Sequence, residues 1–375
     1  MKFYLDAFMF PGKVEEFKSG LKFTGSDPQR YQAVLQKLRD VAVLADEGGI
    51  EGICFSEQHS NIEGVIEVST NPLLLDTYLA GQTKRLKVGQ LGLVLTANHP
   101  LRVAEDIALL DQISGGRAFC GFARGNAKRW VNTFSQHFGT EATDSDKSAV
   151  DEQNLRAVKE AWAIIKAAWT KDTFSHQGEF WTVPAANTNW NFNATTVLGG
   201  GMEANGLLRE VGCVPRLLQK GLPRMFTPLA FRMTTAVFWV SEGATAVCFA
   251  NNDEFMQTAH RVLTETAEKA GRSNGHSVLA PGVFLMVGET KADAEQLRAD
   301  YEWLFKFAYS VPPFNVPIGR VVMGTPDEVT RQIEDLHKLV PFDECFIWHN
   351  LGMHDDALGS KSIELFVDKV LPRLN

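Results

Sequence analysis

LKVGQLGLVLTANHPLRVAEDIALLDQISGGRAFCGFARG, residues Leu86–Gly125, reads as a strand, a helix and a second strand. Residues 87–95 are rich in Val and Leu, which is typical of a strand covered on both faces in a parallel sheet. Pro100 suits the first turn of a helix, and a glycine pair at 115–116 predicts its end. A second apolar run follows over residues 117–122. This order favours an α/β fold.

The same alternation of strand and helix continues along the chain. The predicted strands are Lys2–Phe8, Gly52–Ser56, Lys87–Leu95, Arg117–Phe122, Leu229–Met233, Ala244–Ala250, Val283–Val287 and Glu344–Trp348. Helices with an apolar face are predicted between them, the longest over Val150–Trp169. Eight strands separated by helices favour a (β/α)8 TIM barrel over an open doubly wound sheet. The absence of an early G-x-G-x-x-G motif weakens the second alternative.

Residues 171–227 break this rhythm, and we expect an insertion there, between the fourth helix and the fifth strand. A segment of this length without clear regular structure is usually functional or mobile. Strands inside it remain an open alternative. We expect a single barrel domain over residues 1–375, carrying this insertion.

Composition excludes several classes of function. The formal net charge is -8 and the pI is about 5.7, and no run of basic residues suggests a nucleic-acid surface. No apolar run reaches the roughly 20 residues of a membrane span, and the N-terminus lacks signal-peptide features. The five cysteines form no C-x-x-C pair, and the nine histidines show no metal-binding spacing. We therefore expect a cytoplasmic protein without a metal site.

Candidate catalytic residues follow the second predicted strand, because the active site of a barrel gathers at the carboxyl ends of its strands. They are Glu57, Gln58 and His59. An imidazole that titrates near neutrality suits His59 to act as a general base or as a hydrogen-bond donor. The alternative is structural: His59 ties down a loop, and Glu57 braces a backbone group or an arginine.

An anion site is indicated where the fourth predicted strand ends, at Arg124 and Gly125. A guanidinium binds phosphate through two parallel hydrogen bonds, and glycine leaves space beside it. Thr234 and Thr235 offer hydroxyls and helix N-terminal amides to the same phosphate. Arg156, on the long helix, is equally suited to a surface ion pair. An internal salt bridge for Arg124 and simple helix capping by the threonines are the alternatives.

Motifs along nearly the whole chain, outside the insertion, belong to one pattern. They are MKF at the start, FSEQH at 55–59, NPLLL at 71–75, NHPLRVAEDIALLDQISGGR at 98–117, GFARG at 121–125, MGTPDEV at 323–329 and SIELFVDKVLP at 362–372. This pattern resembles the bacterial luciferase-like monooxygenases, a family of flavin-dependent (β/α)8 barrels.

The resemblance implies a flavin site with FMN as the cofactor. Leu91 and Gly92 would form a strained peptide beneath the isoalloxazine ring, and Ala123 would contact the ring. The FMN phosphate would be held by Arg124, Gly125, Thr234, Thr235 and Arg156. Luciferases carry two adjacent histidines after the glutamate; here the first is Gln58, so its role in proton transfer does not carry over. His59 matches the second.

The resemblance also implies a reaction. Reduced FMN, a cosubstrate supplied by a separate NAD(P)H-dependent flavin reductase, would react with O2 to give a flavin hydroperoxide. This would oxygenate a small organic substrate: an aldehyde, ketone, terpenoid or aromatic compound. Light emission is not implied, because luciferase has cysteine at the position of Ala123. The family commonly forms dimers, so we expect a homodimer.

Two other functions fit the same fold. One is a deazaflavin (F420)-dependent oxidoreductase that transfers a hydride, a branch in which an aspartate often precedes the histidine. The other is a non-catalytic flavin-binding subunit, since Gln58 departs from the catalytic pattern.

Overall fold

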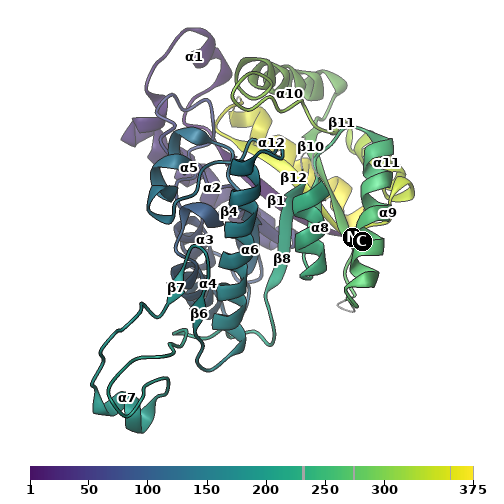
Figure 1. Ribbon diagram of the computed structural model, residues 1–375. Helices are drawn as coiled ribbons and strands as arrows, with labels where there is room; N and C mark the ends of the chain where they lie inside the picture. The colour runs from purple at the N-terminus through teal and green to yellow at the C-terminus, as the bar shows by residue number, and fades with distance from the viewer. Residues whose placement is uncertain (230–232, 273–274, 355, 375) are drawn as a thin grey trace. The chain divides into compact units, whose positions relative to one another are not determined.

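The computed structural model describes residues 1–229, 233–272, 275–354 and 356–374. The chain forms two compact units (Figure 1). Unit 1 comprises Met1–Leu93, Phe119–Phe122 and the chain from Arg224 onward, and unit 2 comprises Val94–Ala118 and Ala123–Pro223. The expectation of one domain over residues 1–375 stays a prediction.

A parallel sheet dominates unit 1. Its strands are β1 (Lys2–Met9), β2 (Gly52–Phe55), β3 (Lys87–Gln90), β4 (Leu93–Val94), β5 (Phe119–Ala123), β8 (Arg224–Leu229), β9 (Thr245–Cys248), β10 (Leu279–Val287), β11 (Val321–Gly324) and β12 (Glu344–Leu351). They are ordered β3-β2-β1-β12-β10-β9-β8-β5-β4, with β11 paired to β10. β3 and β4 stand at opposite ends of this order, yet only two residues separate them in the chain. The sheet is therefore nearly closed into a barrel, which confirms the (β/α)8 prediction.

Apolar side chains fill the barrel interior, one from or directly after each of eight strands, with none from β4 or β11. The cluster is Tyr4, Cys54, Leu91, Phe119, Phe226, Val247, Ala280 and Phe346. Tyr4 stacks on Phe346 with ring centroids 4.8 Å apart, and Phe119 meets the Tyr4 ring edge-on at 5.3 Å. Filled layers of this kind make the interior of such a barrel a packed core without a pore.

Glycines let the β3 and β5 segments approach each other closely. A Cβ atom on Gly89 would lie 2.3 Å from the carbonyl oxygen of Phe119, and one on Gly121 would lie 2.2 Å from that of Gln90. A Cβ on Gly92 would lie 3.0 Å from the carbonyl oxygen of Gly121. Because the opposing atoms are backbone, no rotamer change would relieve these contacts. The glycines of the opening stretch are thus required where the sheet closes.

The helices of unit 1 connect its strands. They are α1 (Val14–Lys18), η1 (Thr24–Ser26), α2 (Pro28–Gly48), α3 (Pro72–Ala80), α8 (Met233–Ser241), α9 (Asp253–Lys269), α10 (Lys291–Leu304), the π-helix η4 (Phe305–Tyr309), α11 (Pro326–Leu339), α12 (Asp356–Leu365), the π-helix η5 (Phe366–Val370) and α13 (Leu371–Leu374). α2 illustrates the local rules: the Asp27 carboxylate accepts from two first-turn amides, and Gly49 ends the helix at φ 86°.

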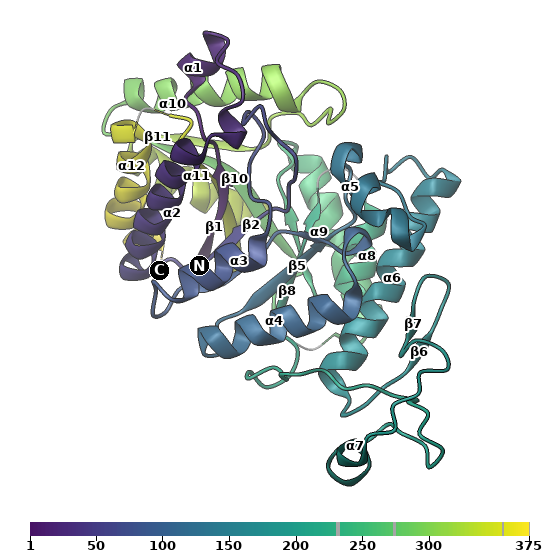
Figure 2. The same ribbon diagram turned by 90° about the vertical axis from the view of Figure 1, so that its left-hand side faces the viewer.

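Unit 2 is mainly helical. It contains η2 (Leu95–Ala97), α4 (Pro100–Ser114), α5 (Lys128–Ser135), η3 (Gln136–Phe138), α6 (Ala149–Thr170), α7 (Asn193–Leu198), and the antiparallel pair β6 (His176–Gln177) and β7 (Thr182–Val183). α4 and α6 pack together, and the Trp169 indole donates to the carbonyl oxygen of Ala104 at 2.9 Å. Figure 2 shows β6, β7 and α7 at the end of unit 2 opposite α5. The expected insertion therefore does contain strands.

Several predicted boundaries were wrong, mostly because of proline. The fifth strand was predicted over Leu229–Met233 but is β8, which starts at Arg224, so the insertion ends at residue 223; residues 230–232 lie outside the described residues. Pro228 is tolerated in β8 because the pairing with β5 covers only the first three residues of β8. β10 likewise starts at Leu279, four residues early, and includes Pro281. The third predicted strand is interrupted at 91–92, and β11 was missed.

Two further findings concern the cysteines and membrane-spanning helices. All five cysteines are buried and unpaired with one another. In the part of the chain that the structure describes, no helix is both long enough and apolar enough to cross a membrane. The cytoplasmic location stays a prediction.

The barrel closure yields a testable prediction. We expect Gly121→Ala to lower the free energy of unfolding by at least about 2 kcal/mol, because the added methyl group meets backbone that cannot move aside. Gly81→Ala is the matched control, since its Cβ would find no atom nearer than 3.6 Å. Chemical denaturation of both variants measures the difference; equal stabilities would contradict the role assigned to Gly121.

Candidate active site

The predicted catalytic residues lie directly after β2 in unit 1. His59 Nε2 lies 3.2 Å from Glu57 Oε1, and the Glu57 side chain is only 6% exposed. Glu57 therefore braces a histidine, where the sequence had suggested a backbone group or an arginine. A carboxylate that holds one ring nitrogen fixes the orientation of the imidazole. This pair has the form of an oriented general base.

Leu91 and Gly92 follow β3 and lie beside the end of β2. The Leu91 amide donates to the carbonyl oxygen of Phe55 at 2.8 Å. The Leu91–Gly92 peptide bond is cis. The structure thus brings two of the predicted ring-contacting residues next to the strand that carries the predicted catalytic residues. Their contact with a flavin stays a prediction.

A group of buried polar side chains lies near this edge and was not predicted. Glu67, in the loop after β2, accepts a hydrogen bond from Ser56 Oγ at 2.9 Å and another from the Tyr309 hydroxyl. Asp6 of β1 is buried beside Cys54, with Oδ1 3.6 Å from the sulfur. Burial raises the pKa of both carboxyls and also that of the Tyr309 phenol. These groups are built to hold protons in a dry site.

Aromatic rings enclose the same end of the barrel. Phe8 and Trp348 stack with centroids 3.5 Å apart and an interplanar angle of 2°. The Tyr309 ring meets the Trp348 ring edge-on, with centroids 5.8 Å apart. The centroid of the Phe284 ring lies 4.6 Å from that of Trp348. Trp348 is the residue that the other rings of this group share as a neighbour. Walls of this kind keep water from groups at the carboxyl ends of β1 and β12.

Arg124 is buried in unit 2 and engaged by other residues of that unit. Its Nε donates to Asn154 Oδ1 at 2.9 Å, and its Nη2 lies 2.6 Å from Asp151 Oδ1. Asn154 Nδ2 in turn donates to the carbonyl oxygen of Arg124 at 3.1 Å. The guanidinium is 7% exposed. The internal salt bridge considered as the alternative is therefore present, and a role with phosphate stays a prediction.

The other predicted phosphate ligands lie in different settings. Gly125 has φ 77°, and a Cβ there would lie 2.6 Å from Val94, so glycine is needed for the local backbone. Arg156 is 53% exposed and pairs with Glu179 at 2.9 Å, as in the surface-pair alternative. Thr234 is exposed and Thr235 half-buried in the first turn of α8. Arg156 and Arg124 therefore make separate ion pairs, the first with Glu179 and the second with Asp151.

Two of the buried polar residues that were not predicted, Glu67 and Asp6, could have been recognised from the sequence. Glu67 is a lone acid within the apolar run GVIEV, and Asp6 is a lone acid within the first strand. A charged residue inside an apolar strand or loop is rarely buried without a function or a partner. Tyr309 carried no such signal, because the π-helix that positions it was not predicted.

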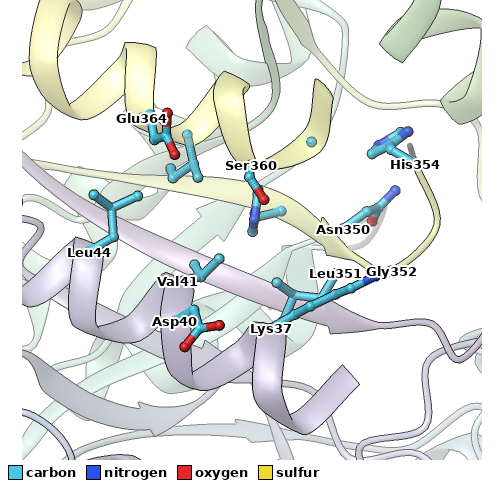
Figure 3. A pocket seen from close by; sticks show the side chains of 13 residues that line it. Lys37, Asp40, Val41, Leu44, Asn350, Leu351, Gly352, His354, Ser360 and Glu364 are labelled. Atoms are coloured by element: carbon cyan, nitrogen blue, oxygen red, sulfur yellow. The ribbon is translucent and has the colours of Figure 1, made fainter. Parts of the chain in front are cut away.

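A separate cavity of about 210 Å³ lies in unit 1 between α2, the end of β12 and α12 (Figure 3). Charged residues of both signs line the cavity: Lys37 is basic, and Asp40 and Glu364 are acidic. His354 there is held by Asp300 at 2.9 Å, and burial lowers the pKa of His349 to about 4, which leaves that ring neutral. This mixture defines no class of ligand. Among the described residues, no cluster of His, Cys, Asp and Glu could hold a metal ion.

The Arg124–Asp151 pair yields a second prediction. We expect Asp151→Asn to lower the free energy of unfolding by about 3 kcal/mol, because it leaves a buried guanidinium without its counter-charge. Glu179→Gln, which breaks the exposed pair with Arg156, serves as the control and should leave stability nearly unchanged. Thermal or urea unfolding distinguishes the two; a mild effect of Asp151→Asn would mean that water or another group compensates Arg124.

Comparisons of sequence place the chain among known proteins. Residues 19–317 match the family model for luciferase-like monooxygenases. The alkanal monooxygenase beta chain of Vibrio harveyi is 30% identical over 193 residues, 52% of this chain and 53% of that protein. The oxygenase component of the flavin-dependent trigonelline monooxygenase of Acinetobacter baylyi is 28% identical over 159 residues, 42% and 40% of the two chains. The chain thus spans about half the length of the curated relatives it matches, or less.

Solved structures with the same fold cover more of the chain. Monooxygenase RslO1 from Streptomyces bottropensis aligns over 100% of both chains with a TM-score of 0.76 and 18% identity. The oxygenating constituent of 3,6-diketocamphane monooxygenase from Pseudomonas putida, in complex with FMN, has a TM-score of 0.66 and 21% identity over 90% of this chain and 93% of that one. At sequence identities of 18% and 21%, the structural similarity shows a shared fold and nothing more. With four-fifths of its sequence matched by the family model, the chain belongs to the luciferase-like monooxygenase family.

Proposed function

We propose that this chain is the oxygenase component of a two-component flavin-dependent monooxygenase. It takes reduced FMN from a separate NAD(P)H-dependent flavin reductase and uses O2 to oxygenate a small organic substrate. The observation that carries the proposal is the arrangement at the carboxyl end of β2, where Phe55 accepts a hydrogen bond from Leu91 and the Glu57–His59 pair follows directly in the chain. Family membership supports the choice of a flavin as cofactor.

The residues at this end of unit 1 fit a flavin ring and an oxygenation reaction. Gln58, His59 and Tyr309 supply hydrogen-bonding groups, and Phe8 with Trp348 supplies apolar walls. Reduced FMN, when bound, supplies the electrons that activate O2. The protein's own task is to exclude water and to position protons, because water promotes side reactions of reactive intermediates. Buried Glu67 and Asp6 suit that task.

His59 and Gln58 have separate parts in this proposal. Glu57 holds one ring nitrogen of His59 and so orients the imidazole, which accepts or donates a proton at the substrate or the flavin. Gln58 stands where luciferases have their first histidine; an amide hydrogen-bonds without titrating, so it orients a ligand but does not carry a proton.

The partners are part of the proposal. The names of two similar proteins, an oxygenase component and an oxygenating constituent, support a separate reductase. A homodimer is supported by the exposure of Leu109 and Ile113 on α4, since large apolar residues on a helix surface suit a protein interface. The proposed substrate is an aldehyde, ketone, terpenoid or aromatic compound.

The reaction with oxygen tests the function. Protein mixed with photoreduced FMN and then with O2 should reoxidise the flavin more slowly than free solution does, and should release less hydrogen peroxide at early times. His59→Ala should keep FMN affinity while changing the reoxidation. Flavin binding with reoxidation and peroxide release as in free solution would support a non-catalytic subunit instead. Binding of reduced deazaflavin but not of reduced FMN would support hydride transfer.

A binding experiment tests the predicted phosphate contact of Arg124. Arg124→Ala should weaken FMN binding by about 1.5 to 3 kcal/mol, the scale of a charged hydrogen bond, while the affinity for riboflavin stays the same. Comparing the two flavins removes any general effect on folding. Asp151→Asn, which leaves the guanidinium in place, should keep the preference for FMN. An equal loss for FMN and riboflavin would exclude Arg124 as a phosphate ligand.

A further inference from the structure

Two buried polar side chains contact each other between α3 and β3. Asp76 lies on α3, Gln90 is the last residue of β3, and neither is exposed to solvent. Gln90 Nε2 donates a hydrogen bond to Asp76 Oδ2 at 2.5 Å. The second oxygen of the carboxyl group, Asp76 Oδ1, and the amide oxygen, Gln90 Oε1, are also buried, and neither has a hydrogen-bond partner among the described residues. Buried polar atoms without a partner are rare in folded proteins, and here two occur on one pair of side chains.

A single proton on Asp76 would give both of these oxygens a partner. An ionised carboxylate only accepts hydrogen bonds, and an amide oxygen only accepts them too, so no bond forms between the two oxygens. A protonated carboxyl group carries an O–H donor, which the amide oxygen of Gln90 accepts. The acid and the amide are then joined by two hydrogen bonds, one in each direction. No polar atom of either group is left unpaired in this arrangement.

The surroundings of Asp76 favour the protonated form. Burial raises the pKa of Asp76 well above its ordinary value, and the hydrogen bonds from Gln90 and the Gly89 amide lower it less than burial raises it. The groups that shift this pKa include no cation. The titratable group that interacts with Asp76 is the Cys54 thiol of β2, whose pKa is raised by burial first and then by Asp6 and Asp76. The thiol is therefore neutral and does not favour a charge on Asp76.

Asp46 on α2 shows the opposite arrangement at the start of β3. Its carboxylate accepts hydrogen bonds from the backbone amides of Lys84, Arg85 and Leu86 at 3.0, 2.7 and 2.6 Å. Burial alone would raise the pKa of Asp46, but these amide hydrogen bonds outweigh it, and the pKa is lowered. A carboxyl group surrounded by donors thus stays ionised, whereas one that lies against an amide oxygen gains a hydrogen bond by keeping its proton.

Gln90 fixes the point at which the chain leaves β3. Its backbone is in register with Phe55 of β2, and its carbonyl oxygen would lie 2.2 Å from a Cβ atom on Gly121. Its side chain contacts α3, whereas the next side chain, Leu91, belongs to the cluster in the barrel interior, because successive residues of a strand point to opposite faces. Asp76 therefore constrains, through Gln90, the start of the Leu91–Gly92 segment.

We propose that Asp76 is a positioning residue: in its protonated form it holds the Gln90 amide through two hydrogen bonds and so fixes the Leu91–Gly92 segment for contact with the flavin ring. The acid–amide pair itself does not depend on a cofactor. Its consequence for flavin binding rests on the proposed flavin-dependent function. Because the pair acts on the contact with the ring, it affects FMN and riboflavin equally.

NMR of the flavin-free protein tests the pair directly. With 13C in the aspartate carboxyl groups, the signals of Asp76 and Asp46 are assigned by their loss in Asp76→Asn and Asp46→Asn. At neutral pH we expect the Asp76 signal at the position of protonated carboxyl groups and the Asp46 signal at the position of carboxylates. An ionised Asp76 at neutral pH would overturn the proposal.

Substitution by asparagine separates the two aspartates by stability. In Asp76→Asn the new NH2 group donates to Gln90 Oε1 and the remaining oxygen accepts from Gln90 Nε2, so the denaturation midpoint in urea should stay close to that of the wild type. In Asp46→Asn the new NH2 group is set against backbone N–H donors, so the midpoint should fall. A fall in Asp76→Asn as large as that in Asp46→Asn would contradict the acid–amide pair.

The pH dependence of stability gives the same information. Since the folded-state pKa of Asp76 is raised, the stability that it contributes is fully present below the unfolded-state pKa and is lost as the pH rises through the folded-state value. Asp76→Asn should lack this part of the decline. An unchanged decline in Asp76→Asn would mean that Asp76 does not keep its proton.

Flavin binding tests the positioning role. The double variant Asp76→Leu with Gln90→Met keeps the size of both side chains and leaves no buried polar atom unpaired, so it should fold. We expect it to bind FMN and riboflavin several-fold more weakly and by the same factor, whereas Asp76→Asn should bind both as the wild type does. Wild-type affinity in the double variant would overturn the positioning role. A wild-type protein that binds neither flavin would refute the proposed function, and the NMR signal would still decide the state of Asp76.

Discussion

The close approach of the backbone at β3 and β5 is the constraint on which the barrel depends. Gly89 and Gly121 leave no room for a Cβ atom, because carbonyl oxygens of the opposite segment would lie within 2.3 Å of it. This approach allows the sheet to close almost completely into a barrel. It also allows the side chains of the barrel interior, Tyr4 and Phe346 among them, to pack together. Since these side chains fill the interior, a reaction site in unit 1 is expected at the carboxyl ends of the strands.

Two buried acids in this protein are handled in opposite ways. Asp151 in unit 2 lies 2.6 Å from the guanidinium of Arg124, so the carboxylate and the guanidinium act as counter-charges for each other. Glu67 in unit 1 has only neutral partners, and burial raises its pKa, so the group keeps its proton more readily. The first arrangement stabilises a structure. The second leaves a carboxyl group with a raised pKa, and perturbed pKa values cluster at functional sites.

Much of the fold and part of the site were predictable from local patterns. Pro28 and Pro100 begin helices, and Gly49 and Gly115 end them, because these residues act through their own backbone. Predictions failed where distant partners decide the outcome. Pro228 lies in β8 beyond its pairing with β5, and Pro281 lies in β10 opposite Cys248 of β9, so neither proline ends its strand. The contact between Glu67 and Tyr309 joins residues 242 positions apart, which no local pattern reveals.

The sequence by itself determined the order of strands and helices, the family, and the positions at which a barrel places its chemistry, because periodicity, caps and motifs are local properties. Only the tertiary structure decided the states of the side chains at those positions. It showed that Glu57 holds His59, that Asp151 engages Arg124, and that Glu67 is buried with no ion-pair partner in the part of the chain that the structure describes. Burial and pairing depend on residues distant in the chain, and they determine charge, hydrogen bonding and the availability of each group for a ligand.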